Sequence, residues 1–125
     1  MFRIGKRNFL TFIKRALQIE NYLAIIKFFF IHQNPFVAIF NEIFSTGDYP
    51  KLLYFNSPTG KANVKIHSHH DFSTFNLIFC REDYFYKQEH KIILDIGSNI
   101  GLSAIYWLTR NDQTIVYCYE PSSEN

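Results

Sequence analysis

The stretch "KIILDIGSNIGLSAIYW", residues 91–107, decides the fold that the sequence predicts. All but one of residues 92–96 are isoleucine or leucine, a continuous apolar run that is typical of a strand buried on both faces of a parallel sheet. Asp95 is the exception, and it lies near the carboxyl end of the run. Because ligands of open α/β sheets bind outside the carboxyl ends of the strands, Asp95 is a candidate binding residue.

Two glycines after the strand predict a tight turn and then a helix. Gly97 lets the backbone turn sharply and leaves room for a ligand to approach. Gly101 permits the helix to pack closely against the strand. Either Ser98 or Asn99 can cap this helix, which the apolar spacing predicts over residues 100–110.

A second apolar run, "TIVYCY" at residues 114–119, predicts another buried strand, so that strand, turn, helix and strand form one right-handed crossover unit. Glu120 follows this run, and 120 − 101 places it 19 residues after the last glycine. Nucleoside-binding folds place an acid that holds the ribose hydroxyls about 20 residues after the glycines. Pro121 disfavours the helical region for Glu120, so we expect this acid to remain extended and to point into the ligand crevice.

The turn does not match the dinucleotide fingerprint. A G-x-G-x-x-G pattern that begins at Gly97 requires glycine at positions 99 and 102, where the chain has Asn99 and Leu102. A dinucleotide-dependent oxidoreductase is therefore the least favoured of the functions considered.

The segments "ILDIGSNIGLSAIYW" and "VYCYEPSSEN" resemble the FkbM-type family of S-adenosylmethionine-dependent methyltransferases. The family pattern is an Asp-Ile-Gly-Ala-Asn-Ile-Gly turn, followed later by an aromatic residue, Glu, Pro and then an Asn. Only Ser98, which replaces the alanine, departs from the turn. The resemblance is specific over residues 91–125, looser over residues 52–90 and slight over residues 1–50.

The resemblance implies S-adenosylmethionine as the cofactor. Asp95 and Gly97 would face its methionine part, Asn99 and Gly101 would shape the loop, and Glu120 would hold both ribose hydroxyls. The cofactor-binding residues implied in this way are Asp95, Gly97, Ser98, Asn99, Gly101 and Glu120. The alternative for Asp95 is that it serves only as a helix or turn cap.

The fold class expected is α/β, an incomplete Rossmann-like methyltransferase fold that begins with its first β-α-β unit in residues 91–125. Such enzymes have a larger sheet, so we expect the chain to be the N-terminal part of a methyltransferase acting on an oxygen or nitrogen of a small or glycan-like acceptor. No catalytic residue is carried over. The alternative is a non-catalytic interaction or membrane-surface module with a remnant Rossmann half.

The N-terminal segment, residues 1–50, is expected to be helical. Residues 7–18 have an apolar face that includes Phe9, Phe12 and Ile13, and a basic opposite face. This helix is interpreted either as a cover on the domain core or as a contact with an anionic membrane surface or a partner helix. A second helix is predicted from Pro35, which suits a first turn, to Gly47, which suits a stop.

Residues 51–90 predict a hairpin and a helix that lead into the Rossmann part. "KLLYFN" and "ANVKIHS" read as strands, with the linker "SPTGK" between them. Asp71 suits the N-cap of the following helix. The nearby histidines, His67, His69 and His70, are interpreted as solvated, because a zinc site wants ligands spaced on ordered elements, and no metal is expected.

Composition also bears on the partners and the location of the protein. The chain has 125 residues and a net charge of only +2, which argues against nucleic acid as a partner. Cys80 and Cys118 form no disulfide pattern, which favours a reducing compartment. The apolar run at residues 22–31 is shorter than the roughly 20 residues that span a bilayer. We therefore expect a cytoplasmic protein, with peripheral membrane contact through the basic helix as the alternative.

Overall fold

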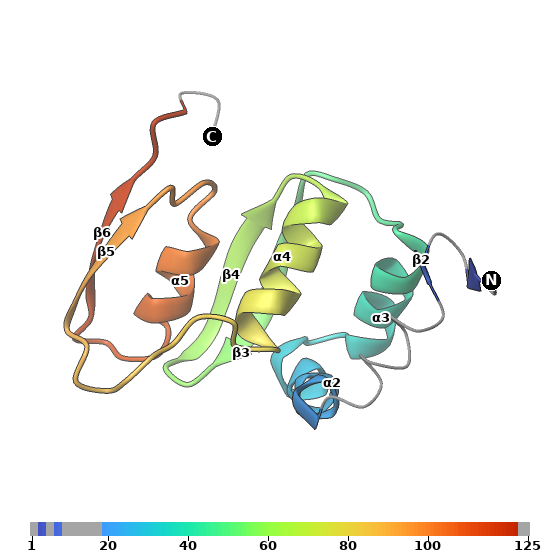
Figure 1. The fold of residues 1–125 in the computed structure, drawn as a ribbon, viewed down its shortest axis with the longest axis horizontal. Helices are drawn as coiled ribbons and strands as arrows, with labels where there is room; N and C mark the ends of the chain where they lie inside the picture. The colour runs from blue at the N-terminus through green and yellow to red at the C-terminus, as the bar shows by residue number, and fades with distance from the viewer. Residues whose placement is uncertain (1–2, 5–6, 9–18, 123–125) are drawn as a thin grey trace.

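The computed structural model describes residues 3–4, 7–8 and 19–122, which form a mixed α/β structure (Figure 1). In this part of the chain, four helices accompany three two-stranded sheets. In chain order the elements are β1 (Arg3–Ile4), β2 (Arg7–Asn8), α2 (Ile19–Ile31), α3 (Pro35–Phe44), β3 (Lys51–Ser57), β4 (Gly60–Ile66), α4 (His69–Phe79), β5 (Ile92–Ile96), α5 (Leu102–Leu108) and β6 (Ile115–Tyr119).

The hairpin β3–β4 and helix α4 lie in the middle of the molecule, with α5, β5 and β6 at one end and α2 and α3 at the other (Figure 1). The hairpin packs against α4 through an aromatic core that contains Phe55, Phe75 and Phe79, each at most 1% exposed. Phe75 and Phe79, four positions apart on one face of α4, stack with ring centroids 4.2 Å apart, and Phe55 meets both rings edge-on. Burying each such ring contributes about 1.5–3 kcal/mol.

The predicted hairpin is confirmed, with a shorter turn than the sequence suggested. Strands β3 and β4 pair antiparallel, and Ser57 pairs with Gly60. Only Pro58 and Thr59 therefore lie in the turn, so part of the expected five-residue linker belongs to the strands.

The prediction that Asp71 caps α4 is wrong by three residues. Ser68 is the N-cap, and its hydroxyl accepts a hydrogen bond from the Asp71 N–H at 3.2 Å. The Asp71 carboxylate in turn accepts the His67 N–H at 2.8 Å. Serine and aspartate thus satisfy backbone donors in a reciprocal pattern close to the capping box, which fixes how β4 leads into α4.

The two predicted N-terminal helices have different outcomes. Helix α3 begins at Pro35 as predicted, but it ends at Phe44 rather than near Gly47, because Ser45 adopts a left-handed conformation with φ of 54°. Of the predicted basic helix, residues 9–18 lie outside the described residues, while Arg7 and Asn8 form strand β2, so that part of the helix prediction is wrong. No helix of the described residues is long and apolar enough to cross a membrane.

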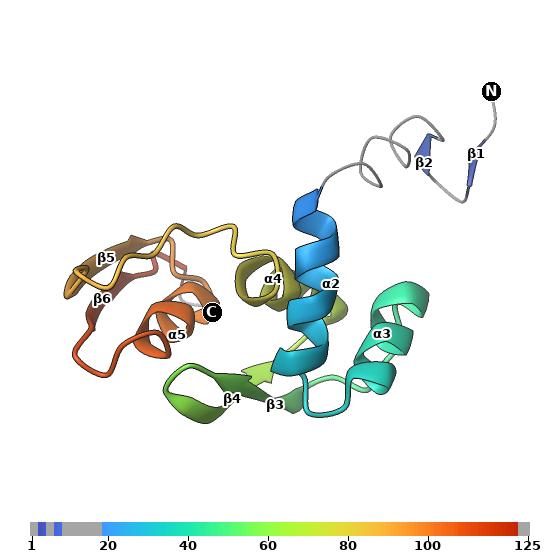
Figure 2. The same ribbon diagram turned by 90° about the horizontal axis from the view of Figure 1, so that it is seen from below.

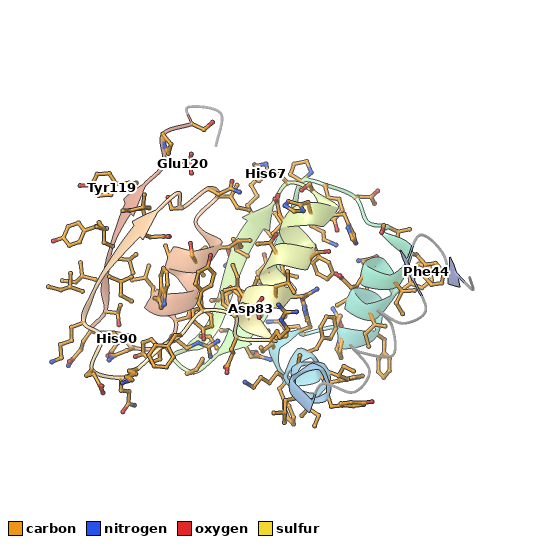
Figure 3. The ribbon with its side chains drawn as sticks, viewed as in Figure 1. Phe44, His67, Asp83, His90, Tyr119 and Glu120 are labelled. Carbon is orange, nitrogen blue, oxygen red and sulfur yellow. The ribbon has the colours of Figure 1, made fainter. Side chains whose placement is uncertain are left out.

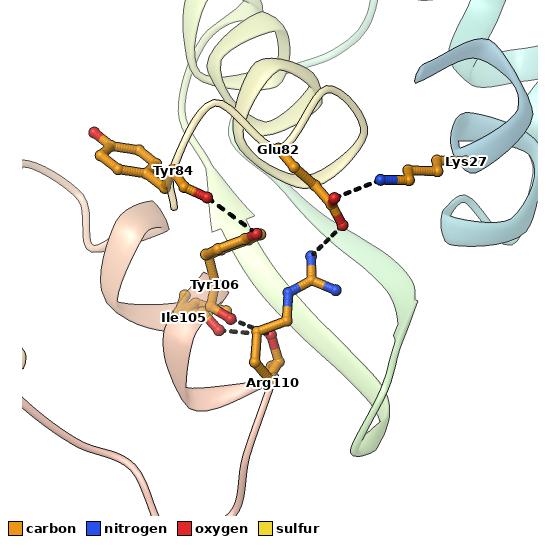
Figure 4. A network of polar contacts seen from close by, with 7 residues as sticks. Lys27, Glu82, Tyr84, Ile105, Tyr106 and Arg110 are labelled. Atoms are coloured by element: carbon orange, nitrogen blue, oxygen red, sulfur yellow. Dashed lines mark hydrogen bonds and ion pairs between the residues drawn. The ribbon is translucent and has the colours of Figure 1, made fainter. Parts of the chain in front are cut away.

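A polar network joins α2, the connection after α4 and the end of α5 (Figure 4). The Glu82 carboxylate forms an ion pair with Lys27, and its other oxygen lies 3.9 Å from Arg110. The Arg110 guanidinium lies 4.2 Å from the ring centroid of Tyr106, whose hydroxyl donates to the Tyr84 carbonyl at 3.3 Å. The Arg110 side chain is only 13% exposed, so its contacts to the ring and to Glu82 fix the end of α5 against residues 82–84.

The predicted β-α-β unit is present. Strands β5 and β6 pair parallel, with Asp95 opposite Cys118, and α5 forms the connection between them. Helix α5 is shorter than the predicted range 100–110, since it begins after Gly101 and ends at Leu108.

The expectation that both strands are buried on both faces is wrong for this structure. Alternate residues of β5 and β6 are exposed on the face away from α5, with Leu94 59% and Tyr117 55% exposed. Helix α5 covers one face only, and no other described element covers the opposite face (Figure 1). The exposed sheet face consists of Ile92, Leu94, Ile96, Ile115, Tyr117 and Tyr119.

Candidate functional site

The turn between β5 and α5 depends on left-handed backbone conformations. Gly97 and Gly101 have φ of +80° and +82°, and Asn99 has φ of +49°. Glycine adopts this region without strain, and asparagine tolerates it better than most residues. A Cβ added at Gly101 would meet nothing within 4 Å, so the prediction that Gly101 serves close helix packing is wrong, and the backbone conformation is the reason for the glycine.

The predicted helix cap at Ser98 or Asn99 is also wrong. The N-cap of α5 is Gly101, and the helix has no side-chain cap hydrogen bond. Ser98 is 6% exposed, and its carbonyl accepts the Gly101 N–H at 2.8 Å, which closes the turn.

The end of β6 holds the turn in place. The carbonyl of Tyr119 accepts the N–H groups of Gly97 at 2.7 Å and Ser98 at 3.2 Å. One residue further along, the Glu120 carboxylate accepts the Asn99 N–H at 2.7 Å and the Ser122 N–H at 2.8 Å. Glu120 lies just past Tyr119 at the carboxyl end of β6 (Figure 3). The sequence-predicted residues of the turn and the second acid are therefore neighbours in space.

Asp95 is buried against α5. Only 8% of this residue is exposed, and its Oδ2 accepts a hydrogen bond of 2.5 Å from the Ser103 hydroxyl. This bond joins β5 to α5 through two side chains. The N–H groups of Gly97, Ser98 and Asn99 in the turn bond to Tyr119 and Glu120 instead of Asp95. Asp95 therefore does not act as a cap on α5, and its Oδ1 accepts no hydrogen bond from any described residue.

A small cleft of about 150 Å³ lies beside the turn. Its far wall consists of residues that the sequence analysis did not assign to a site, namely Asp71, Thr74, Ile78 and Tyr84. Asp71 was found in the sequence only as a capping residue, and Thr74 lies one helical turn after it on the same face of α4. Ligand sites usually measure about 300–1,000 Å³, so this cleft has room for one part of a cofactor-sized molecule.

The histidines of residues 67–70 do not form a metal centre in the described part of the chain. Among described residues, no group of three or more His, Cys, Asp or Glu side chains could hold a metal ion. The Nε2 atom of His69 is buried without a hydrogen-bond partner, and its ring packs near Phe72 with centroids 6.4 Å apart.

Comparison of the chain with models of protein families, with curated proteins and with solved structures finds no match to any of them. We therefore infer a function from the turn, the two acids and the cleft.

Proposed function

We propose that residues 92–120 are the cofactor-binding half of an S-adenosylmethionine-dependent methyltransferase of the FkbM type, with a Rossmann-like fold. The observation that carries the proposal is the hydrogen bond of 2.7 Å from the Asn99 N–H to Glu120. It brings the acid after the second strand to the glycine turn after the first, which is the arrangement that nucleoside-binding α/β folds use for ribose.

The residues present fit the proposed cofactor. A carboxylate accepts the hydrogen bonds of ribose hydroxyls, and two backbone N–H groups fix the orientation of Glu120. Oδ1 of Asp95 can accept from the ammonium of the methionine part, and its negative charge complements that group. Because a Cβ at Gly97 would meet only open space, the cofactor can approach the backbone there.

When bound, S-adenosylmethionine supplies an activated methyl group, and transfer then requires mainly the alignment of an acceptor oxygen or nitrogen with it. The residues of this chain contribute binding and orientation. We propose a small or glycan-like acceptor, and we assign no residue to its deprotonation. The free thiols of Cys80 and Cys118 support the further proposal of a cytoplasmic location.

Saturation-transfer NMR on the 125-residue chain tests the assignment, because this method detects weak binding. The probe is S-adenosylhomocysteine, the demethylated product. NAD is the second probe, because it represents the alternative class of dinucleotide-binding enzymes. We expect saturation of the ribose protons of S-adenosylhomocysteine and about tenfold or more weaker binding after Glu120→Gln, since hydrogen bonds to a charged group contribute about 1.5–3 kcal/mol. Glu89→Gln, on the exposed connection, is the matched control.

Two results would overturn the proposal: absence of any S-adenosylhomocysteine signal, or a stronger signal from NAD. Equal binding by the Glu120→Gln and Glu89→Gln variants would remove Glu120 from the site.

The exposed sheet face favours one alternative, a non-catalytic interaction module. The six side chains of the exposed sheet face are each more than half exposed, and they form a continuous apolar surface on two paired strands. Surfaces of this kind mark contacts with other proteins or further layers of the same fold. If the chain associates through this face and binds no adenosine compound, the interaction module is the better assignment.

A further inference from the structure

A larger cleft is lined by residues of α2, α3 and α4. Figure 2 shows α2 and α3 at the other end of the molecule from β5 and α5, with α4 between them. We call this cleft the helical cleft. Its volume is about 920 Å³, which is within the range of small-molecule sites. Its walls are apolar and come from all three helices, including Phe28 and Phe29 of α2, Ile39 and Ile43 of α3 and Leu77 of α4.

One side of the helical cleft is polar and is organised around Glu42. The Ser73 hydroxyl donates to this carboxylate at 3.1 Å, and the Asn76 amide nitrogen donates at 3.0 Å. Because the amide nitrogen of Asn76 faces an acceptor, its oxygen faces His32, and the His32 Nε2–H donates to that oxygen at 2.7 Å. These donors hold the carboxylate in one orientation at the edge of an apolar space.

The Glu42 carboxylate forms no ion pair with a Lys, Arg or His side chain of the described residues. Burial lowers the pKa of His32, which keeps that ring neutral at neutral pH. Burial also raises the pKa of Cys80 to about 12, so its thiol stays protonated. Arg81 also lines the cleft, and its guanidinium is paired with Asp83. Among the described residues that line the cleft, Glu42 is therefore the charged group without an ionic partner.

We propose that the helical cleft binds a small amphipathic cation, an aromatic or alkyl body that carries a protonated primary amine. The body would replace water along the apolar walls, and the ammonium would donate charge-assisted hydrogen bonds to Glu42. A carboxylate at the edge of an apolar space is stabilised by such a partner, whereas an anionic ligand is repelled.

This site is separate from the proposed cofactor site and does not depend on it. Helix α4 presents Ser73, Asn76 and Leu77 to the helical cleft, and Asp71 and Thr74 to the small cleft beside the glycine turn. A failure of S-adenosylhomocysteine to bind therefore leaves the proposal for the helical cleft intact. A failure of the amine to bind likewise leaves the proposed cofactor site intact.

The test uses three probes of similar shape and different charge: 2-phenylethylamine, 2-phenylethanol and 3-phenylpropanoate. Titrations of the full chain are followed by methyl NMR, in which signals of Ile43 and Leu77 report binding inside the helical cleft. We expect the amine to shift these signals and to bind at least tenfold more tightly than the alcohol, while the carboxylate does not bind.

The matched substitution is Glu42→Gln, which removes the charge and keeps an oxygen that can accept from Ser73. It should weaken binding of the amine at least tenfold and leave binding of the alcohol unchanged, with Glu89→Gln as the control. The proposal is overturned if the alcohol binds as tightly as the amine, if the carboxylate binds best, or if no probe shifts the cleft signals. The charge series on the unmodified chain decides the question even if Glu42→Gln impairs folding.

Discussion

The backbone N–H of Asn99 donates a hydrogen bond of 2.7 Å to the side chain of Glu120, which lies 21 residues later in the chain. Asn99 has a φ of +49° and lies between two glycines that are also left-handed. The turn conformation and the position of the acid therefore depend on each other, and both follow from residues at the ends of two parallel strands.

The left-handed turn predicts an asymmetry between two substitutions. Gly101→Ala should lower the free energy of unfolding by about 1–2 kcal/mol, because an L-residue is strained at φ of +82°. Asn99→Gly should be neutral or stabilising, because glycine adopts the same region freely. Urea unfolding followed by circular dichroism measures both, and an equal loss in the two variants would contradict this account of the turn.

The hydrogen bond between Ser103 and Asp95 predicts that substitutions of these two residues have non-additive effects on the free energy of unfolding. Ser103→Ala should lower the free energy of unfolding by about 1.5–3 kcal/mol, because it leaves a buried carboxylate with one donor fewer. Asp95→Asn in the same chain should recover part of that loss, since a neutral amide is less costly to bury. A double-mutant cycle with Ser103→Ala and Asp95→Asn gives the coupling, and strictly additive losses would show that the bond contributes nothing.

The exposed sheet face predicts that the 125-residue chain associates rather than remaining a monomer. Leu94 and Tyr117 pair across the strands, so Leu94→Lys with Tyr117→Lys places two charges at the centre of this face. The double variant should shift sedimentation towards the monomer. A matched pair, Leu52→Lys with Tyr54→Lys, changes residues of β3 that are exposed to a similar degree, and it should not shift the sedimentation. Monomeric behaviour of the unmodified chain at all concentrations would contradict the prediction.

The buried ring of His32 predicts that stability decreases in mild acid. Burial lowers its pKa from 6.5, and the charge of Lys51 lowers it further, against the opposing hydrogen bond to Asn76. The unfolded chain therefore binds a proton near pH 6.5 that the folded chain binds only at lower pH. The free energy of unfolding should fall by up to about 1.4 kcal/mol per pH unit as the pH drops below 6.5.

Urea unfolding at a series of pH values measures this slope. His32→Gln should flatten it, while His70→Gln, at an exposed position, should leave it unchanged. If the His32→Gln variant keeps the slope of the unmodified chain, another group causes the pH dependence.

The hairpin and the β-α-β unit could be predicted because their signals are local. Turn residues such as Gly97 and Gly60, next to apolar runs of strand length, indicate these units without knowledge of the rest of the chain. Burial could not be predicted in this way. The run at residues 92–96 has the same composition whether one or two layers cover it, and in this structure α5 covers one face.

The capping error and the unforeseen cleft have different causes. Ser68 and Asp71 are both favoured N-cap residues, so local preference does not decide between them, and in the structure Ser68 is the N-cap. The helical cleft has no local pattern at all, because Glu42 meets Ser73 and Asn76 across 31 and 34 residues of sequence. Such a network depends on how three helices pack.

Helix α4 supplies one wall to each of the two clefts, and this has a thermodynamic consequence. A ligand that displaces α4 in order to enter the helical cleft also moves Asp71 and Thr74 against the glycine turn. Any coupling free energy between the two sites must then be the same in both directions, so an amine that weakens nucleoside binding is itself weakened to an equal degree by the nucleoside.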